Sequence, residues 1–335
     1  MAGRKAGCGC APERDDTKAR ATSKDTAGVF EAIPTSAPRL RYGEERQEMA
    51  LIPAGTFLMG CQRREGHRAD GEWPVRNVYL DAFLIDRCAV TNERFARFVS
   101  ETGYVTEAEQ IGWSFVFAGL LPDDFEETRG IAAAPWWRQV MAADWQHPEG
   151  PHSDISERSA HPVVHVSHSD ALAFCAWAGK RLPTEAEWEK AARGGLAGAR
   201  FPWGDEETPG DQHRCNVWQG RFPDLNTQAD GFYGTAPADA FAPNGFGLHN
   251  MAGNAWEWCA DWFTRDRGLR LGGEEGVVHN PSGPATGELR AMRGGSYLCH
   301  PSYCWRYRCA ARSAASPDSA SGHMGFRCVS DLASH

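Results

Sequence analysis

Three cysteines stand at a spacing of five in the stretch GGSYLCHPSYCWRYRCAARS: Cys299, Cys304 and Cys309. Neither a strand nor a helix turns side chains five residues apart toward one another. The sequence HPS between the first two predicts a turn, because proline fixes its own φ and disfavours helix in the residue before it. A bend there would bring the sulfurs of Cys299 and Cys304 together.

Two thiolates at such a bend could bind a soft metal ion. If the chain from Cys304 to Cys309 is extended, Arg306 and Arg308 share a face with Cys304. Positive neighbours favour the thiolate, which is the form that binds metal or acts as a nucleophile. Two thiolates without further ligands suit Cu(I) better than tetrahedral zinc and leave open positions for substrate and oxygen. A short structural disulfide, or burial of both cysteines as small apolar residues, is the alternative explanation.

The composition sets limits on the class of protein. The chain has 335 residues, 41% of them apolar, which is enough for a sizeable core. A net charge of -9 argues against a general nucleic-acid-binding protein. We find no apolar run of about 18 residues that could span a membrane, and no apolar segment of a signal peptide. The 11 cysteines contain no CxxC, which disfavours a zinc finger.

The chain divides into two parts. Residues 1–46 are polar and contain a short CxC at Cys8 and Cys10, which predicts a disordered tail. Residues 47–335 carry frequent glycines and turn signals, which predicts a single domain with modest regular structure. Helices and strands do not alternate regularly in this part, so we expect the α+β class.

Three helices and two extended segments are predicted. The first helix follows Thr91 and ends at Gly103. The second follows Ser169, buries Leu172, Cys175 and Trp177, and ends before Gly179. The third begins with Thr184 as N-cap and Glu187 three residues later, a capping box, and runs to Gly194. Residues 77–86 and 161–167 are predicted to form strands.

Longer motifs resemble a known family. The stretch RGGSYLCHPSYCWRYRCAARS, followed by SPDSASGHMGFRC, is similar to the formylglycine-generating enzymes, the sulfatase-modifying factors. The resemblance continues through IPAGTFLMG, APWW, HPEGP, HPVVHVS, RLPTEAEWE, FPWGDE, NVWQGRFP and GNAWEW, over roughly residues 49–330. Most of these pieces are shared by the wider superfamily and indicate the fold. The paired cysteines of SYLCHPSYC are more specific, because non-catalytic paralogues lack them.

The resemblance implies a fold and an activity. The fold would be a calcium-stabilised variant of the C-type lectin fold with little regular secondary structure. The activity would be copper-dependent aerobic oxidation of the cysteine in a Cys-x-Pro-x-Arg motif of sulfatases to Cα-formylglycine, which activates the sulfatase. The partners implied are an unfolded or nascent sulfatase polypeptide, O₂ and a reductant.

The resemblance also assigns roles to residues. Cys299 and Cys304 would be catalytic Cu(I) ligands that a substrate thiolate joins as a third sulfur, and Ser296 would stand near the reacting centre. Trp256, Tyr303, Arg306 and His323 would line the substrate groove, with His323 standing where the family usually has Asn. One calcium site would use Asn216, Val217, Asp230 and Phe232; the other would use Asn250, Gly253, Ala255 and Glu257. Taken alone, such clusters of Asn, Asp and Gly more often form plain turns.

The family's disulfides are only partly matched. Cys175 and Cys328 match one disulfide, whereas Cys309 matches half of another whose partner position is Ala192 here. Cys309 is therefore expected to be unpaired, as in a reducing cytosol. His168 stands where Trp is usual, and we expect this change to affect packing only. His161, His165 and His300 are not expected to bind metal.

Two rival functions and a localisation follow from the same features. An iron-dependent sulfoxide synthase would need an N-terminal helical domain that 46 leading residues cannot form. A non-catalytic lectin-like peptide-binding paralogue has no need of Cys299 and Cys304. We expect a prokaryotic cytoplasmic protein, with the secretory pathway as the alternative if the N-terminus is trimmed.

Overall fold

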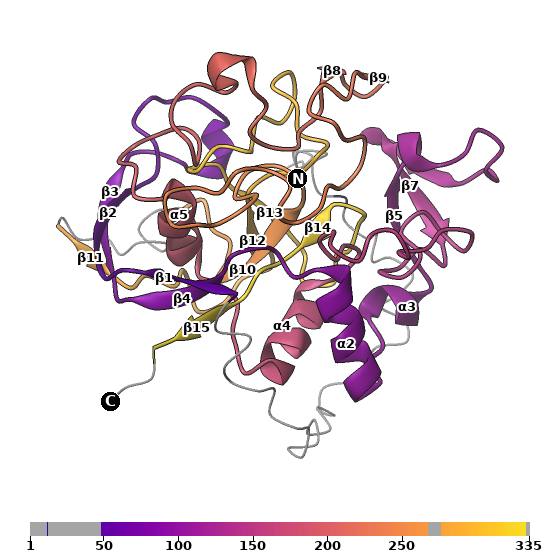
Figure 1. The fold of residues 1–335 in the computed structure, drawn as a ribbon, viewed down its shortest axis with the longest axis horizontal. Helices are drawn as coiled ribbons and strands as arrows, with labels where there is room; N and C mark the ends of the chain where they lie inside the picture. The colour runs from indigo at the N-terminus through magenta and orange to yellow at the C-terminus, as the bar shows by residue number, and fades with distance from the viewer. Residues whose placement is uncertain (1–11, 13–47, 267–275, 333–335) are drawn as a thin grey trace, which may run out of the picture.

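The structure is a computed structural model that describes residue 12, residues 48–266 and residues 276–332 (Figure 1). The predicted disordered tail with its CxC falls on residues that, apart from residue 12, lie outside this part. The boundary proposed at residue 46 also lies outside it and stays a prediction.

Several small sheets form the framework (Figure 1). The central sheet has the order β13-β12-β10-β14, in which β10 pairs antiparallel with β12 and parallel with β14. Its strands are β10 (Trp256–Trp262), β12 (Arg290–Arg293), β13 (Ser313–Ala315) and β14 (Met324–Gly325). A second sheet, β1-β4-β15, joins the two ends of the described chain through β1 (Met49–Ile52), β4 (Phe83–Asp86) and β15 (Val329–Asp331). These mixed, non-alternating elements confirm the α+β prediction.

Three further sheets lie around this centre. They have the orders β11-β3-β2, β5-β7-β6 and β8-β9. Their bounds are β2 (Gly55–Met59), β3 (Arg76–Leu80), β5 (Trp113–Phe117), β6 (Arg129–Ile131), β7 (Ala134–Met141), β8 (Gly220–Arg221), β9 (Leu225–Asn226) and β11 (Val278–His279). The predicted strand over 77–86 is thus two strands, β3 and β4, that belong to different sheets.

The helices begin at side-chain caps, as the sequence predicts. The α-helices are α2 (Asn92–Thr102), α3 (Glu107–Ile111), α4 (His168–Trp177) and α5 (Glu185–Arg193); the short 3₁₀ helices are η2 (Arg68–Asp70), η3 (Ala118–Leu120) and η4 (Pro209–Asp211). Thr91 caps α2, and Thr184 with Glu187 forms the predicted capping box of α5. Gly103 and Gly194 end these two helices in the left-handed conformation, which glycine adopts without strain.

The second helix differs from its prediction in start and in orientation. Its N-cap is Ser167, which forms a capping box with Asp170, so α4 begins two residues early. Ala171, Phe174 and Cys175 face the core at helical spacing. Leu172 lies one step of about 100° round from that stripe and is 44% exposed, so its predicted burial is wrong.

Residues 161–167 form no strand, contrary to the prediction. Only Pro162 makes a bridge, to Thr91. The backbone N–H of Val163 donates to Val90 O, whereas that of His165 donates to Ser321 O, so the segment bonds to two separated parts of the chain. His165 has φ of 61°, which breaks the extended conformation.

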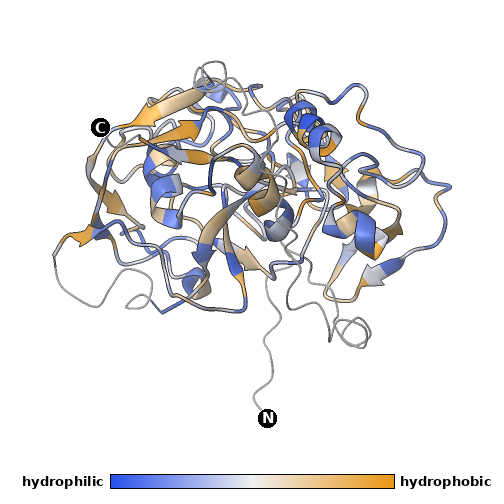
Figure 2. Ribbon diagram, turned by 90° about the horizontal axis from the view of Figure 1, so that it is seen from below, coloured by the Kyte–Doolittle hydropathy of each residue, from blue (hydrophilic) through white to orange (hydrophobic). Residues whose placement is uncertain are grey.

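The largest hydrophobic cluster contains the cysteines of the site. Cys299 and Cys304 pack in it with Trp256, Trp258 and Tyr307, all buried. Figure 2 shows hydrophobic residues along several strands and long connecting segments with little regular structure. Within the described residues, no helix has the length and apolar character needed to cross a membrane.

Candidate functional site

The turn after Cys299 brings two sulfurs together, as predicted. The backbone N–H groups of Tyr303 and Cys304 both donate to His300 O, at 3.1 and 2.9 Å, and close the turn. The Sγ atoms of Cys299 and Cys304 lie 2.9 Å apart, whereas a disulfide would hold them at about 2.05 Å. Both side chains are buried, and both cysteines are free thiols in this structure. The site is therefore a buried two-sulfur pair.

The two thiols of the pair differ in acidity. Burial raises the pKa of Cys299, and its hydrogen bond with Cys304 and the charge on that sulfur raise it further. Burial acts in the same direction on Cys304, but the hydrogen bond from Cys299 and the charge of Arg306 outweigh it and lower the pKa of Cys304. Cys304 is therefore the more acidic of the two thiols.

Arg306 reaches this sulfur although the chain around it is not extended. Trp305 has φ of 47°, so residues 304–309 form no strand and the predicted shared face is wrong. The backbone and guanidinium of Arg306 nevertheless hydrogen-bond Cys304. Arg308 instead turns to Glu72, with Nη1–Oε2 and Nη2–Oε1 distances of 2.6 and 2.7 Å.

Ser296 lies beside the other sulfur. Its backbone N–H donates to Cys299 Sγ at 3.4 Å, and its Oγ accepts from Leu298 N at 3.3 Å. Ser296 is buried, and it is its backbone that contacts the two-sulfur pair.

The predicted substrate-binding residues fall into different surroundings. Trp256 is fully buried in the core, and its backbone N–H donates to His323 O at 2.8 Å. Arg306 is also buried and paired with Asp70. His323 is buried, with Nδ1 2.7 Å from Ser321 Oγ and its ring 4.5 Å from that of Trp137. Their predicted contact with a peptide stays a prediction.

Tyr303, which is predicted to line the substrate groove, belongs to a partly exposed aromatic group whose other members the sequence analysis does not assign to the site. Its ring stacks on Phe222 at 4.2 Å and meets Trp136 edge-on at 5.8 Å. Its hydroxyl donates to Leu298 O at 2.7 Å, one residue before Cys299. Trp136 stands in APWW and Phe222 in NVWQGRFP, two motifs of the family resemblance to which no site residue is assigned.

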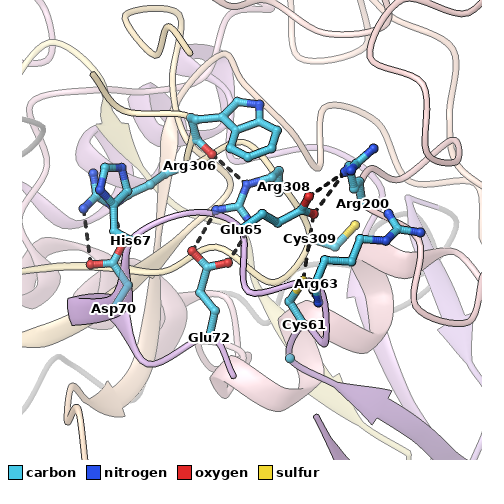
Figure 3. A network of polar contacts seen from close by, with 12 residues as sticks. Cys61, Arg63, Glu65, His67, Asp70, Glu72, Arg200, Arg306, Arg308 and Cys309 are labelled. Carbon is cyan, nitrogen blue, oxygen red and sulfur yellow. Dashed lines mark hydrogen bonds and ion pairs between the residues drawn. The ribbon is translucent and has the colours of Figure 1, made fainter. Parts of the chain in front are cut away.

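A loop far away in the sequence also touches the site. His67 Nε2 lies 2.8 Å from Cys304 O. Asp70 accepts from Arg306 Nε at 2.6 Å (Figure 3). More than 230 residues separate these partners. The sequence contains no local signal that connects them.

The residues of the first predicted calcium loop lie close together, and the calcium site itself stays a prediction. Asp230 accepts from Val217 N through Oδ2 at 3.0 Å and from Phe232 N through Oδ1 at 3.1 Å. Asn216 bridges to Gly253 of the second loop, so the two loops lie side by side. Burial raises the pKa of the Asp230 carboxyl, a cost that a bound cation would offset.

The second predicted loop has one free oxygen and one occupied carboxylate. Asn250 Nδ2 donates to two carbonyls, but its buried Oδ1 has no hydrogen-bond partner among the described residues. Glu257 accepts from Arg327 through both oxygens at 2.7 Å and from Trp188 Nε1 at 2.7 Å. The described part of the chain contains no group of three His, Cys, Asp or Glu placed to hold a metal ion. Calcium there would need amide and carbonyl oxygens, which these loops provide.

The remaining predicted positions are structural. The Sγ atoms of Cys175 and Cys328 are 3.5 Å apart as thiols, so the predicted disulfide stays a prediction. Cys309 lies in one hydrophobic cluster with Ala192, and burial raises its pKa to about 12. Burial lowers the pKa of His168 to about 3, and its Nε2 lies 3.2 Å from Cys259 O. His168 thus behaves as a neutral packed residue.

Comparisons with known proteins agree with this geometry. Residues 36–332 match the model of the sulfatase-modifying factor enzyme 1-like domain. The chain is 55% identical over 295 residues to the formylglycine-generating enzyme of Thermomonospora curvata, covering 88% of this chain and 97% of that protein. It is 43% identical over 300 residues to the inactive Cα-formylglycine-generating enzyme 2 of Mus musculus, covering 88% and 90%.

A solved structure supports the fold. The structure of PvdO from Pseudomonas aeruginosa superposes with a TM-score of 0.62 at 25% identity, covering 85% of this chain and 94% of that one. The family match over most of the chain and this structural match confirm the predicted fold, and the chain belongs to the sulfatase-modifying factor enzyme 1-like family.

Proposed function

We propose that this protein is a formylglycine-generating enzyme that oxidises a sulfatase cysteine in a Cys-x-Pro-x-Arg motif to Cα-formylglycine. The observation that carries the proposal is the buried two-sulfur pair, with Sγ atoms 2.9 Å apart. A relative that shares 55% identity over 88% of the chain has this activity in its name. A binding module would not require such a pair.

The two-sulfur pair fits Cu(I). Thiolates are soft ligands that select this ion, and the lowered pKa of Cys304 favours its thiolate form. When bound, Cu(I) would supply one-electron chemistry with O₂. The reaction balances as substrate thiol plus O₂ plus two reductant thiols, giving the aldehyde, H₂S, water and one reductant disulfide. The chain itself supplies no reductant in this scheme.

The residues around the pair orient the substrate in this proposal. Cys299 and Cys304 would hold the metal, and Ser296, whose backbone N–H donates to Cys299 Sγ, would help to orient that sulfur. Burial of both cysteines excludes bulk water from the reacting sulfur. The aromatic group of Tyr303, Phe222 and Trp136 offers an apolar surface for the proline of the motif.

Calcium has a structural role in the proposal. Asn216, Asp230 and the carbonyls of Val217 and Phe232 would hold one ion. Asn250 and the carbonyls of Gly253 and Ala255 would hold the other, and Glu257 could join them only by giving up a hydrogen bond to Arg327 or Trp188. The partnerless Oδ1 of Asn250 supports the second site, because a buried acceptor without a partner is costly. We further propose a reducing, cytoplasmic location, in which thiols such as Cys309 persist unpaired.

Mass spectrometry of a substrate peptide tests the activity. Reduced protein, one equivalent of Cu(I), air, a thiol reductant and a Cys-x-Pro-x-Arg peptide should give an aldehyde that hydroxylamine traps. Cys299→Ser and Cys304→Ser should each lower the rate at least about 100-fold, because each removes a metal ligand. Cys309→Ser is the matched control: it removes a third cysteine at the same spacing and should retain activity.

One alternative has specific support. The mouse relative at 43% identity is named inactive, so family membership alone does not establish catalysis. If the wild-type protein binds the peptide but neither binds Cu(I) nor converts the cysteine, the peptide-binding alternative is correct.

A further inference from the structure

Arg306 joins two groups that are far apart in the sequence. Its Nε and Nη2 donate to Asp70 Oδ2 and Oδ1, at 2.6 and 3.2 Å (Figure 3). The same guanidinium hydrogen-bonds the Cys304 side chain. Arg306 and Asp70 are only 4% and 7% exposed, so water competes little for either contact. The order of contacts is therefore Asp70, Arg306, then the Cys304 sulfur.

Asp70 is itself held in place from several sides. It ends η2, and Gly71 follows in the left-handed conformation with φ of 69°. Its carbonyl accepts from Arg312 Nη1 at 2.7 Å. Three residues earlier, His67 Nε2 lies 2.8 Å from the carbonyl oxygen of Cys304. The loop therefore reaches Cys304 in two ways: His67 contacts its backbone carbonyl, and Asp70 reaches its sulfur through Arg306.

We propose that Asp70 is a positioning residue for the two-sulfur pair: it holds the Arg306 guanidinium against Cys304 and so fixes the direction in which that sulfur binds Cu(I). This inference rests on the copper site of the proposed function. The guanidinium is planar with donors in fixed directions, so its side-on bond to Asp70 determines where the remaining donors point. Removing the carboxylate would free the group to turn away from the sulfur. In the wild-type protein, according to this proposal, Arg306 contacts Cys304 inside the site and does not line the peptide groove.

The expected effect is on copper affinity. Loss of a partner that orients a metal ligand typically weakens metal binding by about 10–100-fold. We expect Asp70→Asn to weaken Cu(I) binding by this factor, measured by competition with a chromophoric Cu(I) chelator under anaerobic, reducing conditions. The amide can still accept one hydrogen bond but lacks the charge that pairs with the guanidinium.

Glu72 provides the matched control. It lies two residues along the same loop and pairs with another buried arginine, Arg308, at 2.6 and 2.7 Å. Arg308 also bonds Trp305 O, and no contact to either cysteine of the pair is seen for it in the described residues. Glu72→Gln should therefore lower the melting temperature as Asp70→Asn does, yet leave Cu(I) affinity within about twofold. Equal losses of affinity in the two variants would overturn the proposal.

A second variant keeps the test decisive if Asp70→Asn does not fold. Arg306→Lys retains a cation for Asp70 but cannot bond the carboxylate and the sulfur with one planar fork. It should weaken Cu(I) binding by a similar factor, and the double variant should be no weaker than either single one, because both act through one contact. Additive losses would show that Asp70 and Arg306 act independently and would reject the inference.

The outcomes separate this inference from the proposed function. If the wild-type protein binds no Cu(I), the proposed function fails and the inference fails with it. If the wild type binds Cu(I) and loses it in Cys299→Ser and Cys304→Ser, but Asp70→Asn binds as tightly as Glu72→Gln, only the inference fails.

Discussion

At the scale of single residues, Cys299 and Cys304 occupy the same turn but are chemically different. Both are buried, and burial alone would make both thiols hard to ionise. Arg306 and the hydrogen bond from Cys299 lower the pKa of Cys304, whereas Cys299 stays protonated as the donor. The reactivity of the pair is therefore expected to be concentrated on one sulfur.

Alkylation of the metal-free protein measures this difference. At neutral pH, iodoacetamide should modify Cys304 at least about tenfold faster than Cys299, because the thiolate is the nucleophile. Peptide mapping by mass spectrometry gives the two rates. Cys309 is as buried as Cys304 but its pKa is raised to about 12, so it is the internal control and should react more slowly than Cys304. Faster modification of Cys299 than of Cys304 would contradict the difference in acidity.

The sequence predicted that Cys299 and Cys304 lie together, but it did not predict the distant residues that contact them. The bend between the cysteines follows from HPS, because turn chemistry is local. Asp70 and His67 contact the pair from more than 230 residues away, and only the folded chain brings them there. Periodicity and spacing describe neighbours in sequence, so they could not identify these contacts.

At the scale of elements, the helices were better predicted than the strands. The caps of α2 and α5 lie in the sequence itself, because Thr91 and Thr184 bond groups within three residues. Residues 161–167 carry the alternation of a strand but find partners in Val90 and Ser321 instead of a neighbouring strand. Strand formation depends on such distant partners, which explains the error.

The capping box of α5 contributes measurably to stability. Thr184 Oγ1 accepts from Glu187 N at 3.2 Å, and Thr184→Ala should lower the free energy of unfolding by about 1 kcal/mol. Chemical denaturation measures this change. Thr208, which precedes η4 and makes no side-chain cap, serves as the control, and Thr208→Ala should change the free energy by less than about 0.5 kcal/mol. Equal losses in both variants would argue against the cap.

At the scale of the whole molecule, buried ion pairs tie distant segments together. Arg293, Arg308, Arg312 and Arg327 are essentially unexposed, and each contacts a buried glutamate. One carboxyl in this interior is different: burial and the charge of Glu185 raise the pKa of Asp261 to about 7. Stability should therefore depend on pH through this residue.

The sign of that dependence can be derived. Between pH 5 and 8 folded Asp261 releases its proton, whereas the unfolded residue is already ionised, so wild-type stability falls as pH rises. Asp261→Asn removes this titration, and its stability relative to wild type should increase by about 2 kcal/mol from pH 5 to pH 8. Denaturation curves at the two pH values test this. Asp205→Asn is the control and should show no such change, because the pKa of exposed Asp205 is lowered to about 2.

Calcium removal should also act on the whole molecule. An ion bound only by the folded state stabilises it, so excess chelator should lower the melting temperature by several degrees. Asp230→Asn, which weakens one proposed site, should show a smaller response to the chelator than wild type does. A melt that chelator leaves unchanged would count against both calcium loops.

The ion pairs of Asp70 with Arg306 and of Glu72 with Arg308 have a consequence for synthesis of the chain. A ribosome releases Asp70 and Glu72 long before Arg306 and Arg308, so the nascent chain carries carboxylates whose cations do not yet exist. Cys304 likewise lacks its contact with Arg306 until residue 306 has been synthesised. If the two-sulfur pair holds Cu(I) as proposed, a chain that ends before residue 306 should bind the ion more weakly than the full chain, because it lacks the Arg306 contact.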